Sequence, residues 1–268
     1  MPGTEFRALH QKGNPFTLMN AWDAGSAKML AAMGAQAIAT TSAGHAFTLG
    51  RPDMGRVSRD ESLTHAQDLV AAVNLPVSGD FENGYGDDPD TVAETIRLAA
   101  EAGLAGCSIE DTRMGDAPSA YDFDLAVDRI RAAAAAARAL PRDFVLVARA
   151  DGIMNGFYDV DEAIRRLQAF DTAGADCLYA PLPKTMDDLR RIIACTQKPV
   201  NVLVTGAFAH YSRAEFAAMG AARLSLGSGL ARITHAMIAD CGRTILNGDF
   251  TDFQRAARGA QIDAMLTN

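Results

Sequence analysis

The chain has 268 residues, of which 49% are hydrophobic and 22% are charged, and its formal net charge is −8 at pH 7. A chain of this size and composition can bury a large core, which excludes an intrinsically disordered protein and a mini-protein held together by disulfides. The acidic balance argues against a general nucleic-acid binder, because such proteins carry a basic face.

Short apolar runs alternate along the chain with longer segments of helical spacing. The predicted strands are Phe16–Asn20, Ala35–Thr41, Pro76–Phe81, Gly106–Glu110, Phe144–Arg149, Asp176–Ala180, Val200–Val204 and Arg223–Leu226. The predicted helices are Ala24–Met33, Arg59–Ala72, Pro89–Ala102, Leu125–Leu140, Val160–Ala173, Met186–Cys195 and Arg213–Met219, and a further helical region follows Gly229.

The sequence (Met/Ala)-Gly-Ala recurs at 33–35, 173–175 and 219–221, after a predicted helix and before a predicted strand. This repetition indicates a repeated βα unit, and eight such units of about 33 residues fit one (β/α)8 barrel of the TIM type over residues 1–268. No GxGxxG follows the first strand, which disfavours a dinucleotide-binding sheet. The region from about 229 to 268 forms extra C-terminal helices.

The start of the chain, Met1 to Lys12, contains no apolar core of a signal peptide, and no apolar stretch is long enough to span a membrane. The four cysteines form no CxxC pair, so we interpret them as reduced thiols. These features predict a cytoplasmic protein without a membrane partner.

Acidic residues gather at the predicted strand ends, where a β/α barrel places its active site. Asp80 and Glu82 end the third strand, Glu110 ends the fourth, and Asp53 lies in the loop after the second. Like charges held together repel one another, and a divalent cation removes the conflict. With no His or Cys nearby, the oxygen donors predict Mg²⁺, or alternatively Mn²⁺.

Arg149 ends the fifth strand and is predicted to bind a substrate carboxylate through its guanidinium fork. The alternative is a structural ion pair with Asp151 or Glu110. The turn Thr41-Ser42-Ala43 offers hydroxyl and N–H groups to a second carboxylate, and His45 follows in the same loop.

The chain resembles the isocitrate lyase and phosphoenolpyruvate mutase superfamily from about Phe16 to Gly229. The likeness rests on four segments in order: Leu49–Asp53, Gly79–Gly86, Ser108–Asp111 and Ala148–Asp151. It implies a β/α barrel that forms a homotetramer (a dimer of dimers), with the last helix packed on a neighbouring subunit. It implies Mg²⁺ held directly by Asp80 and mostly through water by Asp53, Glu82 and Glu110. It also implies small 2-oxo or 2-hydroxy acid substrates, bound by Arg149 and the Thr41-Ser42-Ala43 turn, and an enolate intermediate.

The loop after Glu110-Asp111 departs from the well-marked branches of this superfamily. It lacks the Lys-Lys-Cys-Gly-His of isocitrate and methylisocitrate lyases, and Thr112 replaces the lysine of phosphonopyruvate mutases and hydrolases. By elimination we favour carbon–carbon cleavage of a small dicarboxylate, with oxaloacetate decarboxylation first. Tyr85, Arg113 and His45 are candidates to contact the variable end of the substrate. Two alternatives stay open: a phosphonopyruvate P–C hydrolase or mutase, and a barrel that binds 2-oxo acids without turnover.

Overall fold

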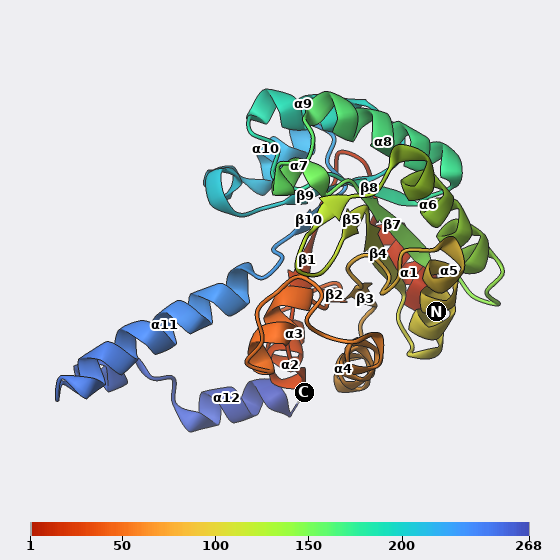
Figure 1. Ribbon diagram of the computed structural model, residues 1–268. Coiled ribbons are helices and arrows are strands. Elements are labelled where there is room, and N and C mark those ends of the chain that lie inside the picture. The colour runs from red at the N-terminus through yellow and green to blue at the C-terminus, as the bar shows by residue number, and fades with distance from the viewer. Residues whose placement is uncertain (1, 268) are drawn as a thin grey trace.

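Eight parallel strands close into a barrel in a computed structural model that describes residues 2–267 (Figure 1), in the order β1-β10-β9-β8-β7-β4-β3-β2. They are β1 Phe16–Asn20, β2 Ile38–Ala39, β3 Val77–Asp80, β4 Gly106–Glu110, β7 Val145–Arg149, β8 Cys177–Tyr179, β9 Val200–Leu203 and β10 Arg223–Ser225. Each lies within a predicted strand, so the predicted fold class is confirmed.

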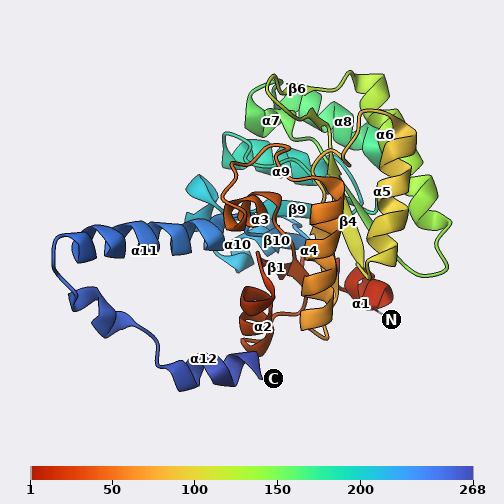
Figure 2. The same ribbon diagram turned by 60° about the horizontal axis from the view of Figure 1, so that its bottom comes forward.

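Helices follow the strands and pack around the outside of the barrel (Figures 1 and 2). Seven of them are α2 Ala24–Ala32, α4 Arg59–Ala72, α5 Pro89–Glu101, α6 Phe123–Arg138, α8 Val160–Ala173, α9 Met186–Ala194 and α10 Arg213–Ala218. Capping boxes at Ser58 and Ser212 begin α4 and α10, and Gly174 ends α8 in the left-handed conformation that favours glycine.

Several short elements were not predicted. They are α1 Pro2–Leu9, α3 Ser42–Thr48, α7 Gly152–Asn155, the 3-10 helices η1 Gly206–His210 and η2 Thr251–Arg255, and the antiparallel pair of β5 Thr112–Arg113 with β6 Ser119–Ala120. The predicted turn after β2 is the start of α3, because the Thr41 side chain accepts the N–H of Gly44 and caps a helix.

Helix α1 closes the amino end of the barrel. Phe6 is fully buried and packs edge-on against Phe16, the first residue of β1, with 6.0 Å between ring centroids. Arg7 binds Asp143 and Asp176, which precede β7 and β8. The cavity described below therefore opens only toward the carboxyl ends of the strands.

The C-terminal helices extend from the barrel as an arm (Figures 1 and 2). In α11 Gly229–Leu246 only Ala231 is buried, and α12 Gly259–Leu266 returns to α2, where Lys28 Nζ donates to the Leu266 carbonyl at 3.1 Å. No helix within residues 2–267 combines the length and the apolar character needed to cross a membrane.

Candidate active site

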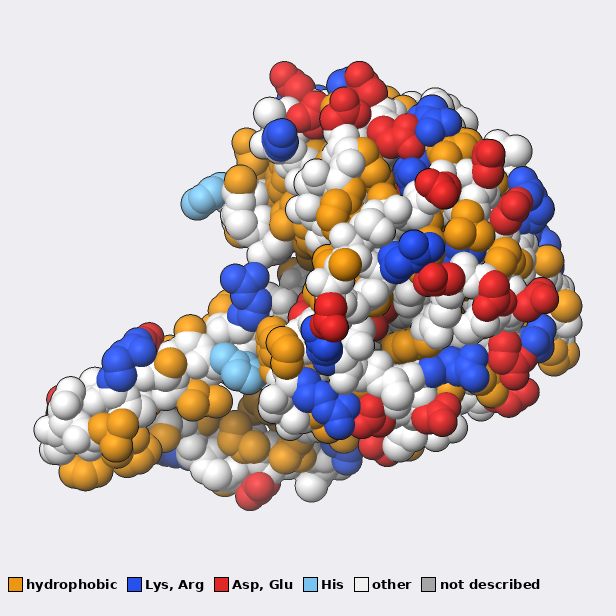
Figure 3. Space-filling view, viewed as in Figure 1, with side chains coloured by type: hydrophobic (Ala, Val, Ile, Leu, Met, Phe, Trp, Pro, Cys, Tyr) orange, Lys and Arg blue, Asp and Glu red, His pale blue; other side chains and the backbone are white. Residues whose placement is uncertain are grey.

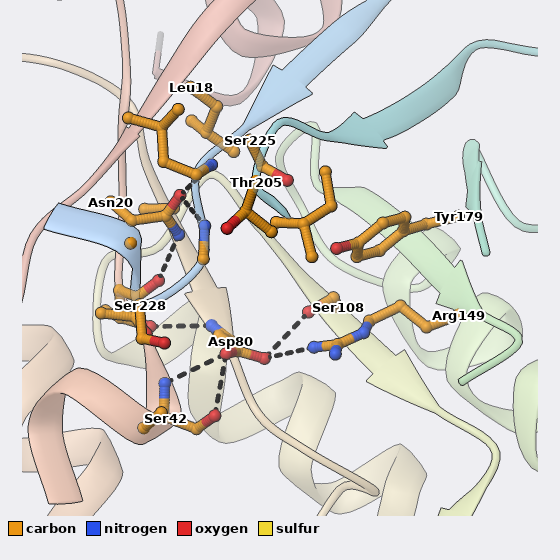
Figure 4. A pocket seen from close by; sticks show the side chains of 18 of the residues that line it. Leu18, Asn20, Ser42, Asp80, Ser108, Arg149, Tyr179, Thr205, Ser225 and Ser228 are labelled. Atoms are coloured by element: carbon orange, nitrogen blue, oxygen red, sulfur yellow. Dashed lines mark hydrogen bonds and ion pairs between the residues drawn. The ribbon is translucent and has the colours of Figure 1, made fainter. Parts of the chain in front are cut away.

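A cavity of about 210 Å³ lies at the carboxyl ends of the barrel strands (Figure 4). All eight barrel strands contribute to its wall. The polar lining consists of Asn20, Thr40, Thr41, Ser42, Asp53, Ser78, Asp80, Ser108, Arg149, Tyr179, Thr205, Arg223, Ser225, Ser228 and Arg232. No His, Cys or Lys is among the lining residues that the structure describes.

Asp80 lies at the centre of this lining (Figure 4). One carboxylate oxygen accepts hydrogen bonds from the Ser42 N–H at 3.0 Å and the Ser42 hydroxyl at 2.9 Å. The other accepts from Arg149 Nη1 at 2.6 Å. Its backbone N–H donates to Thr40 Oγ1 at 2.7 Å, which fixes the end of β3 against β2.

Arg149 meets three carboxylates at the end of β7. Besides Asp80, its Nε and Nη2 donate to the two oxygens of Asp151 at 2.9 and 2.7 Å, and Nη2 lies 3.1 Å from Glu110. Burial would lower the pKa of Arg149, but Asp151, Glu110 and Asp80 together raise it well above its usual value. Arg149 thus forms the structural ion pairs considered as an alternative, while Nη1 lies at the cavity wall.

A second layer of buried charge supports Asp151. Its backbone N–H donates to Asp111 at 2.8 Å, and Asp111 also accepts from the Tyr158 hydroxyl at 2.8 Å and from Arg166 at 3.0 Å. Since each group is buried and bonded, the guanidinium of Arg149 is held in one orientation.

The acidic groups near Asp80 keep their protons more readily than free carboxyls do. Burial, with a smaller contribution from the charges of Asp80 and Asp53, raises the pKa of Glu82 to about 7 against the opposing hydrogen bond from the Gly55 N–H. Burial likewise raises the pKa of Asp53, and that of Glu110 well above its usual value. The site therefore has an excess of negative charge that a cation would stabilise.

The oxygen donors fit a hard divalent ion such as Mg²⁺. Asp80 and Asp53 line the cavity, whereas Glu82 borders a neighbouring groove and Glu110 pairs with Arg149. Within residues 2–267 no three acidic, His or Cys side chains form a metal cage by themselves. Mg²⁺ usually binds proteins through one or two carboxylates and keeps several waters, so Asp80 with water-mediated neighbours is a sufficient donor set.

Three predicted contact residues lie outside the cavity lining. The His45 ring stacks on His65 between α3 and α4, with 3.8 Å between centroids. Tyr85 packs edge-on against Phe81 and borders the neighbouring groove. Arg113 pairs with Asp87 at 3.1 Å and lies over the Tyr121 ring. Each is therefore held by protein neighbours rather than directed at the cavity.

Other lining residues were not predicted, although strand periodicity could have found some of them. Alternate residues of a barrel strand point inward, which places Arg223 and Ser225 of β10 and Tyr179 of β8 inside. Arg232 reaches the cavity from α11, and only the fold reveals this position.

Comparisons with known proteins identify relatives of this chain. Residues 6–246 match the family model described as phosphoenolpyruvate phosphomutase. The chain is 33% identical to 2-methylisocitrate lyase of Escherichia coli K12 over 76% of the chain and 70% of that protein. It is 31% identical to 2,3-dimethylmalate lyase of Eubacterium barkeri over 64% of the chain and 60% of that protein. The crystal structure of a candidate lyase/mutase from Burkholderia cenocepacia J2315 superposes with a TM-score of 0.94, at 46% identity, over 100% of this chain and 96% of that one.

Proposed function

The chain belongs to the phosphoenolpyruvate phosphomutase family, and from this premise we propose that it is a Mg²⁺-dependent carbon–carbon lyase. Its substrate is a small 2-oxo or 2-hydroxy dicarboxylate, and oxaloacetate decarboxylation is the reaction we favour first. The observation that carries the proposal is the Asp80 carboxylate, held by Arg149 and Ser42 at the wall of a cavity the size of a small organic acid.

Asp80 would hold Mg²⁺ directly, and Asp53, Glu82 and Glu110 would hold it mostly through water. When bound, the ion acts as a Lewis acid toward the oxygens of a 2-oxo acid. Arg149 supplies a fixed positive charge beside Asp80. The Thr41-Ser42-Ala43 segment at the start of α3, whose Ser42 N–H and hydroxyl donate to Asp80 in the structure, would orient a substrate carboxylate.

Among the reactions considered, decarboxylation requires the fewest catalytic side chains in this cavity. The C3–C4 bond of oxaloacetate breaks, CO₂ leaves, and the electron pair forms the enolate of pyruvate, which then takes a proton from water. The described lining holds no thiol, imidazole or ammonium to serve as a dedicated acid. Thr112 is buried and its hydroxyl accepts from Asn155 at 3.3 Å, so it does not replace the lysine of the P–C branch.

The test is release of 2-oxo acids from C4–C7 2-oxo and 2-hydroxy dicarboxylates with Mg²⁺ or Mn²⁺, assayed by a coupled dehydrogenase. We expect turnover above the rate of free metal, and loss of the excess with chelator or with Asp80→Asn. Asp187→Asn is the control, because that side chain is 86% exposed on α9. Equal rates for Asp80→Asn and wild type would overturn the assignment, and phosphate release from phosphonopyruvate would favour the P–C reaction.

We further propose that the arm packs on neighbouring copies in a homotetramer. Ile233, Ile238 and Leu246 of α11 and Phe250 and Phe253 beyond it are all more than half exposed. Hydrophobic side chains gather at the outer end of the arm in Figure 3. Such a patch is unusual for a monomer and typical of an obligate interface.

A further inference from the structure

Arg223 is a buried cation without a matching acid. It is 4% exposed, begins β10, and pairs in register with Phe16 at the start of β1. Its Nε donates to Asn201 Oδ1 at 2.8 Å, but Nη1 is buried without a hydrogen-bond partner, and no carboxylate within the described residues forms an ion pair with it.

The other two buried arginines within the described residues, Arg129 and Arg166, have no buried side-chain nitrogen without a hydrogen-bond partner. Arg129 donates to the carbonyls of Asn83, Gly86 and Asp87, and Arg166 pairs with Asp111 and Glu162. An unpaired buried charge is costly because it loses its hydration, so the exception at Arg223 needs a reason.

Arg223 lies at the inner end of the same cavity that Asp80 and Arg149 line. Asn201, which accepts from Arg223, is itself fixed, because its Nδ2 donates to the Ser225 hydroxyl at 2.8 Å. Ser225 also forms a hydrogen bond with the Tyr179 hydroxyl, and Arg149 lies over the Tyr179 ring. Three arginines therefore line one small cavity: Arg232 reaches it from α11, Arg149 lies near the mouth and Arg223 lies toward the bottom. The volume of about 210 Å³ has room for about seven water molecules, which matches a small organic acid.

We propose that Arg223 binds the second carboxylate of the substrate at the inner end of the cavity and selects dianionic acids over monoanionic ones. The identity of this ligand rests on the proposed function. The position of Arg223 near the amino end of β10 distinguishes this group from the Asp80, Arg149 and Ser42 cluster, which lies at the carboxyl ends of the strands.

Calorimetric titration with Mg²⁺ tests the proposal without turnover. The probes are matched pairs of C4–C7 2-hydroxy acids that differ only in the second carboxylate, such as malate and 2-hydroxybutanoate. We expect wild type to prefer the dicarboxylate of at least one pair. Arg223→Met should weaken the binding of that dicarboxylate by roughly tenfold to a hundredfold, which corresponds to the loss of one charge-assisted hydrogen bond. The affinity for the matching monocarboxylate should change by less than about twofold.

Stability provides the second readout. Because Arg223→Met removes an uncompensated buried charge, its urea midpoint of unfolding should equal or exceed that of wild type. The urea midpoint of Arg129→Met should be lower than that of wild type. Equal effects on both members of every pair, no preference in wild type, or destabilisation of Arg223→Met to the extent of Arg129→Met would each overturn the inference. Because these are binding measurements, their failure is distinct from an absence of lyase activity in the substrate screen.

Discussion

The pairing of Arg149 with Asp151 predicts strong energetic coupling at the cavity wall. Asp151 is 1% exposed, and both its oxygens accept from Arg149. Asp151→Asn keeps the shape but turns one acceptor into a donor that faces an Arg149 N–H. Losing one charge-assisted hydrogen bond and opposing two donors should cost about 3 kcal/mol. Arg149→Met should cost a similar amount, about 3–5 kcal/mol, because it strands buried carboxylates.

When Arg149→Met has already removed the partner, adding Asp151→Asn should lower the free energy of unfolding only slightly. The expected coupling free energy is therefore about 3 kcal/mol, measured by urea unfolding of wild type, both single variants and the double variant. The titrations belong at pH 8, above the raised pKa of about 7 at Glu82, so that this neighbouring carboxylate is ionised.

The exposed pair of Glu94 and Arg97 on α5 is the control cycle, in which the coupling should stay below about 0.5 kcal/mol. If Arg149 and Asp151 give additive costs within the same 0.5 kcal/mol, Asp151 does not hold Arg149 in solution, and the argument that this layer positions the guanidinium fails.

Three further outcomes follow from the packing. Arg129→Met should destabilise the fold by about 3 kcal/mol in urea, because the carbonyls of Asn83, Gly86 and Asp87 lose their donor; a change under 0.5 kcal/mol would contradict this. Burial, with a smaller contribution from His65, lowers the pKa of His45 to about 4, so the unfolded chain binds the proton first and stability falls from about pH 6.5 toward pH 4. In His45→Phe the free energy of unfolding should fall by about 1 kcal/mol less over this pH range than in wild type, after allowance for solvent screening. Parallel curves of unfolding free energy against pH for the two proteins would refute the lowered pKa. Ile233→Lys with Ile238→Lys should lower the mass found by light scattering if the arm packs on other copies, whereas Arg243→Ala, an exposed change on the same helix, should not.

The sequence predicted the barrel well because each strand is a compact apolar run and six of the seven outer helices begin with a capping side chain. The sequence also predicted that Asp80, Ser42 and Arg149 lie together, since polar residues at strand ends meet at one mouth in any β/α barrel, and all three line the cavity. The same rule predicted His45 beside the substrate, whereas Thr41 caps α3 and the His45 ring stacks on His65 of α4, outside the cavity lining.

Arg223 shows the other limit. It stands inside an apolar run, and although strand periodicity could have placed it inward, only the closed barrel reveals that no acid within the described residues pairs with it. The sequence did not predict the hairpin β5–β6, because its four paired residues are too few to give a strand pattern. Local periodicity thus predicted the helices and strands. Which buried charges have a partner depends on contacts between residues far apart in the sequence, and these the periodicity does not contain.

Closure of the barrel by α1 also constrains the order of events. Phe6 and Phe16 seal the amino end, so the cavity is a blind channel with a single entrance. Whatever occupies the inner end enters first and cannot leave until the fragment nearer the mouth has gone. If the bond between the two carboxylates is cleaved, the fragment bound to Arg223, which is CO₂ in the decarboxylation of oxaloacetate, would therefore leave last. Product inhibition should then be competitive for that inner fragment alone.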